Sequence, residues 1–309
     1  MSTAIDVEGL TKRFGGRTVV DHVDLKVEEG RICGFLGPNG SGKTTTLRMI
    51  CGLLIPDEGR GTVLGLDLAT QRQAIKRQIG YMTQKFGLFG DLTIRENLAF
   101  VARVYGLDRR TERVDAALEQ LGLATRANQL AGNLSGGWKQ RLALAACVLH
   151  EPRILLLDEP TAGVDPQARR EFWDQIHALA KTGITVLVST HYMDEAERCH
   201  EIAYIAYGVM LARGTTHDVI AGSGLHALRG EGPGADRLAG EIAHRPGVSS
   251  AAAFGTTLHV CGTDPAALRK AVEPWADRIR FTESAPTLED VFIDLMGKAR
   301  DNSVVEAVA

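Results

Sequence analysis

The segment Gly37-Pro38-Asn39-Gly40-Ser41-Gly42-Lys43-Thr44 lies between an apolar run at residues 31–36 and a helical pattern that begins near Thr45. It matches G-x-x-x-x-G-K-[ST], in the strand–loop–helix setting that this pattern requires. Glycines let successive backbone N–H groups turn toward phosphate oxygens, and the start of the helix adds a positive dipole. The segment therefore predicts a phosphate-binding loop in an α/β fold.

Two side chains of this loop carry charge or metal chemistry. Lys43 supplies a positive charge for the outer phosphates of a nucleotide, and the hydroxyl of Thr44 is a ligand for Mg²⁺. The alternative is a glycine-rich turn without a ligand, but such a turn has no need of the strand before it and the helix after it. We therefore expect this loop to bind a nucleoside triphosphate and Mg²⁺.

A second motif follows about a hundred residues later, where the apolar strand at residues 154–158 ends in Asp158 and Glu159. Strand ends in an α/β sheet deliver side chains to the ligand crevice. Asp158 is suited to hold the metal, directly or through water, and Glu159 to orient or deprotonate an attacking water. Acidic residues after a strand are often only solvated, but the two motifs together favour a site.

Composition excludes several classes of protein. The 309 residues are 44% hydrophobic and 24% charged, with a formal charge of −3, so a globally basic nucleic-acid binder is not expected. No apolar run approaches the ~18 residues of a membrane span. The first residues lack a signal-peptide pattern, which predicts a cytoplasmic protein. The five cysteines form no C-x-x-C pair and read as buried thiols.

The order of patterns suggests two domains. Apolar runs alternate with helical patterns in the first two-thirds, which predicts a domain at residues 1–222 with a helical insert at about 93–150. The small residues at 221–224 read as a linker. The strands expected in the first domain are at residues 18–27, 31–36, 61–65, 79–82, 154–158, 185–189 and 202–206.

The remaining residues, 223–309, predict a small α+β accessory domain. The order is strand 225–229, helix 236–244, strand 249–254, strand 257–261, helix 265–275 and strand 278–282. This β-α-β-β-α-β order is typical of a ferredoxin-like fold. A last helix begins at Leu288, with Thr287 as its cap and Asp290 at its third position. The residues after Gly297 read as a frayed tail.

A third motif, Leu134-Ser135-Gly136-Gly137-Trp138-Lys139-Gln140, precedes a helix and lies about twenty residues before the acidic pair. By itself it would be an ordinary helix cap or anion-accepting turn. In order with the other motifs it resembles the signature of the ABC transporter ATPases. The resemblance covers residues 5–214 and implies a P-loop NTPase fold with a RecA-like core, an antiparallel β subdomain and a helical insert.

Further residues resemble motifs of that family. Phe14 matches the aromatic that stacks on adenine, where the family more often has Tyr, although a lone aromatic is more often a core residue. Gln84 resembles the glutamine that senses Mg²⁺. Asp165, in Gly163-Val164-Asp165-Pro166, matches the loop that crosses to the opposite subunit. His191 matches the switch histidine at the γ-phosphate, although a single histidine near a strand end is usually surface or core.

Taken together, the motifs and the resemblance imply ATP as the nucleotide and assign these roles. The catalytic residues are Glu159, His191, Gln84 and Lys43. The metal ligands are Thr44, Gln84 and Asp158. The nucleotide-binding residues are Phe14, Gly37, Pro38, Asn39, Gly40, Ser41, Gly42, Lys43, Thr44, Thr45, Leu134, Ser135, Gly136, Gly137 and Asp165.

One phosphate loop and one signature per chain imply two chains arranged head to tail, with each ATP between Lys43 of one and Ser135 of the other. The second chain would be a copy of this one or a homologous ATPase. The resemblance also implies a separate membrane permease subunit, so we expect the chain on the inner face of the cell membrane. No nucleic-acid partner is expected, because no basic patch interleaves with aromatic residues.

Residues 81–98 and 286–292 resemble the daunorubicin-resistance-type, multidrug-export branch of the family. This implies export of a drug-like or lipophilic substrate. The alternatives are an importer ATPase or a soluble ABC ATPase without a transport role. Phe86, Leu88 and Phe89 lie close together after Gln84 and are candidate anchors for the membrane subunit, although Phe89 could equally be a core residue.

Overall fold

A computed structural model describes residues 2–299, apart from the side chain of Phe254. Contacts divide the chain into two compact units, one up to Met210 and one from Leu211. The domain boundary after residue 222, expected from the linker composition, stays a prediction. Each unit is described by itself below.

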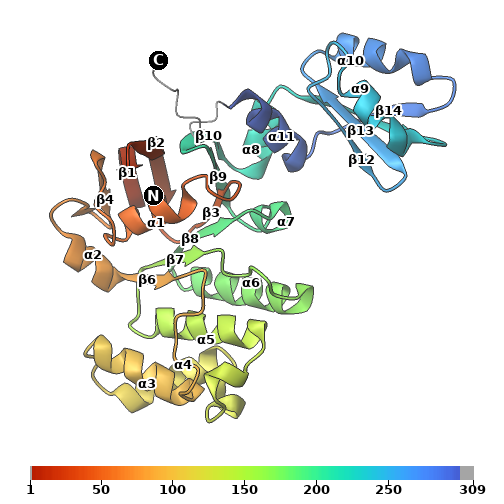
Figure 1. The fold of residues 1–309 in the computed structure, drawn as a ribbon. Helices are drawn as coiled ribbons and strands as arrows, with labels where there is room; N and C mark the ends of the chain where they lie inside the picture. Colours follow the sequence, from red (N-terminus) through yellow and green to blue (C-terminus); the bar gives the residue numbers. More distant parts are fainter. Residues whose placement is uncertain (1, 300–309) are drawn as a thin grey trace. The chain divides into compact units, whose positions relative to one another are not determined.

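The first unit contains two sheets (Figure 1). A six-stranded sheet has the order β10-β9-β3-β8-β7-β6, and its pairs β9–β3, β3–β8, β8–β7 and β7–β6 are parallel. An antiparallel sheet has the order β2-β1-β4-β5. The strands are β1 Thr3–Phe14, β2 Arg17–Glu28, β3 Ile32–Leu36, β4 Glu58–Val63, β5 Leu66–Asp67, β6 Ile79–Met82, β7 Ile154–Asp158, β8 Thr185–Thr190, β9 Glu201–Ala206 and β10 Val209–Gly214, which crosses the unit boundary.

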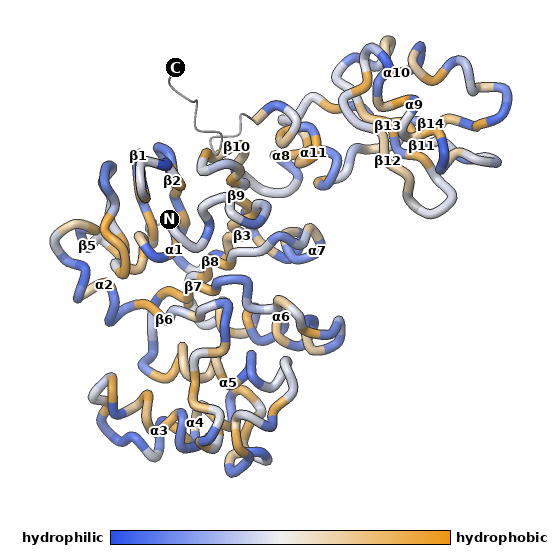
Figure 2. Tube along the Cα trace, in the orientation of Figure 1, coloured by the Kyte–Doolittle hydropathy of each residue, from blue (hydrophilic) through white to orange (hydrophobic). Residues whose placement is uncertain are grey.

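Helices cover both faces of the six-stranded sheet. The strand β7 shows this, because Leu155 and Leu157 belong to one apolar cluster and Ile154 and Leu156 to the other. Burial on both faces explains why β3, β7 and β8 read as continuous apolar runs, which stand out in Figure 2. The helices are α1 Lys43–Ile50, α2 Arg72–Gln78, α3 Ile94–Val104, α4 Arg110–Gln120, α5 Gly136–Val148, α6 Pro166–Lys181 and α7 Met193–Ala196.

The helical insert is confirmed in α3, α4 and α5, and two short 3₁₀ turns lie between α4 and α5. Thr93 and Glu96 form a capping box at the start of α3. Three strands, β1, β5 and β10, were missed from the sequence. β1 has several register shifts against β2, so its buried residues do not alternate regularly.

The second unit has a four-stranded antiparallel sheet of order β12-β13-β11-β14. Its β-α-β-β-α-β element order is the predicted one, with short helices that break into 3₁₀ turns where single helices were expected at 236–244 and 265–275. The elements are α8 Thr216–Gly222, β11 His226–Glu231, α9 Ala239–Ile242, β12 Ser250–Phe254, β13 Thr257–Gly262, α10 Pro265–Val272, β14 Arg280–Ser284 and α11 Leu288–Lys298. Thr287 and Asp290 form the predicted capping box of α11.

Over residues 2–299, the helices are all too short or too polar to cross a bilayer. The five cysteines are free thiols, as expected, and four of them are buried.

Candidate functional site

The phosphate loop connects β3 to α1, and Lys43 is the first residue of α1. The Lys43 ammonium donates hydrogen bonds to the carbonyl oxygens of Gly37 at 2.7 Å and Pro38 at 3.0 Å. Its Nζ lies 3.5 Å from Oε1 of Glu159. Burial lowers the pKa of Lys43, and the nearby carboxylate of Glu159 opposes that shift. A cation is thus held under the loop, next to the acidic pair.

Two features of the loop suit phosphate. The hydroxyl of Ser41 is buried and has no hydrogen-bond partner among the described residues. A Cβ at Gly37 would lie 2.0 Å from the carbonyl oxygen of Ile205, so only glycine fits there. A buried polar group without a partner is costly unless a ligand or water satisfies it. The unpartnered Ser41 hydroxyl, beside the N-terminus of α1, is therefore suited to donate a hydrogen bond to an anion.

We expect Gly42→Ala to destabilise the protein more than Gly40→Ala. Both glycines have positive φ, 101° and 79°, which costs an alanine about 1–2 kcal/mol. Only at Gly42 would the new Cβ meet a neighbour, the Val19 carbonyl oxygen at 2.7 Å. Thermal unfolding of the nucleotide-free variants measures the difference. An equal loss at both positions would show that the contact with Val19 relaxes freely.

Asp158 ends β7 and is almost fully buried at 2% exposure. Its Oδ1 accepts hydrogen bonds from Thr44 Oγ1 at 3.0 Å and from Ser189 Oγ at 2.8 Å. The parallel register of β7 and β8 pairs Asp158 with Ser189. Hydroxyl and carboxylate oxygens are the donors that Mg²⁺ prefers, so Thr44 and Asp158 form a suitable metal-binding pair.

Ser189 was missed as a site residue. Its signal in the sequence was its place directly before Thr190-His191, at a strand end.

The carboxylate of Glu159 lies next to three other predicted site residues. Its Oε2 accepts a hydrogen bond from Gln84 Nε2 at 2.9 Å and lies 3.6 Å from Nδ1 of His191. Lys43 lies near its other oxygen. The backbone of Glu159 has φ 46° and its N–H donates to Ser189 Oγ at 2.9 Å. A strained backbone held by such bonds is typical of functional sites.

The signature residues lie elsewhere in the first unit. Ser135 caps the N-terminus of α5 by its backbone, and Gly137 packs so close to α6 that a Cβ would lie 2.6 Å from that of Ala168. Asp165 caps α6 by accepting from the N–H groups of Gln167 and Ala168. Ser135, Gly137 and Asp165 line one pocket of about 210 Å³.

Within residues 2–299, no hydrogen bond or ion pair joins this pocket to the group around Glu159. α1 and α5 lie on opposite faces of the six-stranded sheet (Figure 1). The two halves of the predicted site are therefore separate in one chain.

The other predicted nucleotide residues differ in exposure. Phe14 ends β1 and is 49% exposed, so the core alternative for Phe14 is wrong. The Nζ of Lys12 lies 5.5 Å from the centroid of its ring. Asn39 and Gly40 are exposed, and Thr45 is half-buried. Leu134 is buried in the core, so only its backbone can face a ligand.

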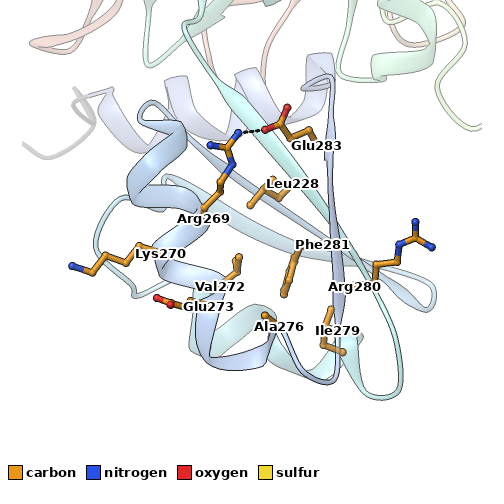
Figure 3. Close-up of a pocket in the computed structure, with 10 residues that line it drawn as sticks. All are labelled: Leu228, Arg269, Lys270, Val272, Glu273, Ala276, Ile279, Arg280, Phe281 and Glu283. Atoms are coloured by element: carbon orange, nitrogen blue, oxygen red, sulfur yellow. Dashed lines mark hydrogen bonds and ion pairs between the residues drawn. The ribbon is translucent and has the colours of Figure 1, made fainter.

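A larger pocket, of about 760 Å³, lies in the second unit and contains none of the predicted site residues (Figure 3). Its floor is apolar, with Leu228, Val272, Ile279 and Phe281, and Arg269 forms an ion pair with Glu283 at one end. The unit therefore has a surface hollow of ligand size, but not one lined by the chemistry predicted from the sequence.

Comparison with known proteins agrees with the resemblance. Residues 20–162 match the ABC transporter family model. The chain is 37% identical to the Nod factor export ATP-binding protein I of Rhizobium sp. (strain N33), over 96% of this chain and 97% of that protein. It is 48% identical over 223 residues to the probable multidrug ABC transporter ATP-binding protein YbhF of Escherichia coli (strain K12), covering 72% of this chain but only 39% of that relative's length.

Among solved structures, cbiO1 from Clostridium perfringens, described as part of the ABC transporter complex cbiONQ, superimposes with a TM-score of 0.66. It is 27% identical, and the match covers 72% of this chain and 92% of cbiO1. This agrees with the α/β fold described above. The chain therefore belongs to the ABC transporter family, as one of its ATP-binding proteins.

Proposed function

We propose that this chain hydrolyses ATP to power an exporter whose channel is a separate membrane subunit. The observation that carries the proposal is the group around Glu159, where Gln84, Lys43 and His191 converge on one carboxylate beside Asp158 and Thr44. Each of these residues has a role in phosphoryl transfer to water. Magnesium-dependent ATP hydrolysis by the purified chain tests the proposal, and its absence even with a membrane partner present would reject it.

Thr44, Asp158 and Gln84 would hold Mg²⁺. When bound, the ion neutralises charge on the β- and γ-phosphates. Thr44 and Ser189 both donate hydrogen bonds to Oδ1 of Asp158, and the Tyr81 hydroxyl donates to Oδ2 at 3.4 Å. The metal-binding carboxylate is thus oriented by its protein neighbours.

In the reaction, Glu159 would accept the proton of a water that attacks the γ-phosphorus. The bond from that phosphorus to the bridging oxygen breaks, and ADP and phosphate leave. Lys43 would bind the phosphates before and during this step, and His191 would contact the γ-phosphate. A carboxylate as general base contributes about 10²–10⁴ in rate.

A second chain completes the site in this proposal. The signature residues Ser135 and Gly137 line a pocket that is separate from the phosphate loop, so one chain does not close around a nucleotide. ATP held between the phosphate loop of one copy and the signature of another would make dimer closure part of the binding energy. A copy of this chain or a homologous ATPase could fill that role.

Export, with a drug-like or lipophilic substrate, is the direction favoured here. It is supported by similarity to relatives named for multidrug and Nod factor export. Transport in inside-out vesicles that contain the chain and its membrane subunit tests the direction. Uptake that depends on a substrate-binding protein would favour an importer instead.

The membrane subunit is proposed to dock on the helical insert at the cytoplasmic face of the membrane. Of the three candidate anchors, Phe86 and Leu88 pack against the core, whereas Phe89 is 47% exposed. Its ring meets that of Phe100 edge-on, with centroids 5.1 Å apart. The buried Asn97 side chain holds the Phe89 backbone through two hydrogen bonds of 2.9 Å. Phe89 is thus an apolar side chain presented by a fixed backbone.

We expect Phe89→Ala to keep the ATPase activity of the isolated chain and to lower transport about tenfold, the scale of an aromatic anchor at an interface. Vesicle transport and soluble ATPase assays measure both. Ile55→Ala, at a side chain that is 55% exposed outside the insert, is the matched control and should change neither. Loss of both activities in Phe89→Ala would contradict a docking role.

A further inference from the structure

Glu195 is a buried carboxylate without a role in the site described above. It lies in α7 and is 1% exposed. Thr161 Oγ1 donates a hydrogen bond to its Oε1, and Thr190 Oγ1 donates to its Oε2 at 2.6 Å. The Nε of Arg169 lies 3.6 Å from Oε1. Since an unpaired buried carboxylate is very costly, these partners are what allow it to stay there.

The partners of Glu195 come from three segments that border the catalytic group. Thr161 follows Glu159 closely and begins the turn toward Asp165, because its carbonyl oxygen accepts from the N–H of Val164 at 3.2 Å. Thr190 ends β8 and directly precedes His191. Arg169 lies in α6, whose first turn is capped by Asp165. One carboxylate therefore ties together the segment after the acidic pair, the segment before the histidine, and α6.

A column of side chains leads from Arg169 to the histidine. The Arg169 guanidinium carbon lies 4.2 Å from the centroid of the Tyr192 ring. The Tyr192 ring in turn lies 4.1 Å from the ring of His191, with 37° between the planes. The Tyr192 N–H also donates to Thr190 Oγ1 at 3.0 Å. His191 is thus backed on one side by Tyr192, and Tyr192 is held at both its backbone and its ring.

We propose that Glu195 is a positioning residue, which fixes His191 through Thr190, Arg169 and Tyr192 and ties it to the segment that begins at Thr161. The proposal rests on the proposed function, in which His191 and Glu159 act on the γ-phosphate and the attacking water. Within the described residues, no hydrogen bond or ion pair joins Glu195 to His191 or Glu159. Its effect should therefore fall on turnover and spare nucleotide affinity, which depends on the phosphate loop.

The test is Glu195→Gln in the full chain with saturating MgATP. A glutamine keeps the shape, but its NH₂ cannot accept a hydroxyl hydrogen bond and it carries no charge for Arg169. We expect kcat to fall about 10–100-fold, the scale of a misplaced catalytic group, with ATP affinity and Tm near those of the wild type. Glu197→Gln, at the exposed C-cap of α7, is the control and should keep wild-type kcat.

A double-mutant cycle with Arg169→Met separates positioning from a general structural role. Both residues act through the same column, so the double variant should lose about as much kcat as the more affected single variant. Losses that multiply would overturn the proposal. If Glu195→Gln does not fold, Arg169→Met decides by itself, because unchanged kcat in that variant contradicts the column.

The outcomes distinguish this inference from the proposed function. Wild-type chain that hydrolyses ATP, together with a fully active Glu195→Gln, overturns the role of Glu195 alone. Wild-type chain without magnesium-dependent hydrolysis, even with a membrane partner present, overturns both.

Discussion

Glu159→Gln should bind ATP as the wild type does and lose turnover by about 10²–10⁴-fold, the contribution of a general base. Glutamine has the size of glutamate and can still accept from Gln84 through its carbonyl oxygen, so the cluster keeps its shape. It has no basic carboxylate for the proton of the attacking water. Nucleotide affinity by fluorescence and steady-state phosphate release measure the two quantities separately.

The same variant tests the two-chain arrangement. With hydrolysis blocked, ATP should hold two copies of the chain together, and light scattering should report a dimer that is absent without nucleotide. Glu119→Gln, at an exposed position in α4, is the matched control and should keep wild-type turnover. A Glu159→Gln chain that stays monomeric with ATP would reject the homodimer and favour a homologous partner. Weakened binding with unchanged turnover would contradict the assignment of Glu159.

Lys43→Ala should weaken ATP binding about 10–100-fold, because hydrogen bonds to charged groups contribute roughly 1.5–3 kcal/mol. The ammonium lies beneath the loop, on the carbonyl oxygens of Gly37 and Pro38, where it is placed to meet the outer phosphates. Isothermal titration calorimetry of ATP binding to the purified variant measures the loss of affinity. Lys181→Ala, at the exposed end of α6, is the control.

Stability should respond differently from binding in Lys43→Ala. Burial lowers the pKa of Lys43 and so disfavours its charge, whereas its hydrogen bonds to the carbonyl oxygens of Gly37 and Pro38 favour the fold. Because these effects oppose each other, removal of the side chain should change Tm only slightly. A large fall in Tm would mean that the loop needs the ammonium to fold. An equal loss of ATP affinity in Lys43→Ala and Glu159→Gln would contradict their separate roles.

Local sequence patterns were enough to predict much of the fold. The phosphate loop, the apolar strand before the acidic pair and the capping box at Thr287 each depend on residues within a few positions of one another. The strand β1 was missed because its register shifts against β2 break the alternation that reveals a strand. Motif order also indicated the family, which the comparisons confirmed.

The sequence by itself determined which side chains have the chemistry to bind phosphate, metal and water, because residue type and local spacing carry that information. Only the tertiary structure decided which of them meet. Thr44 reaches Asp158, and Gln84 reaches Glu159, across a parallel sheet whose strand order and register no local pattern encodes. The same register brings Ser189 to Asp158, and packing of α6 and α7 brings Arg169 to Glu195. The physical reason is that such contacts form between distant segments, where side-chain packing and strand pairing set the geometry.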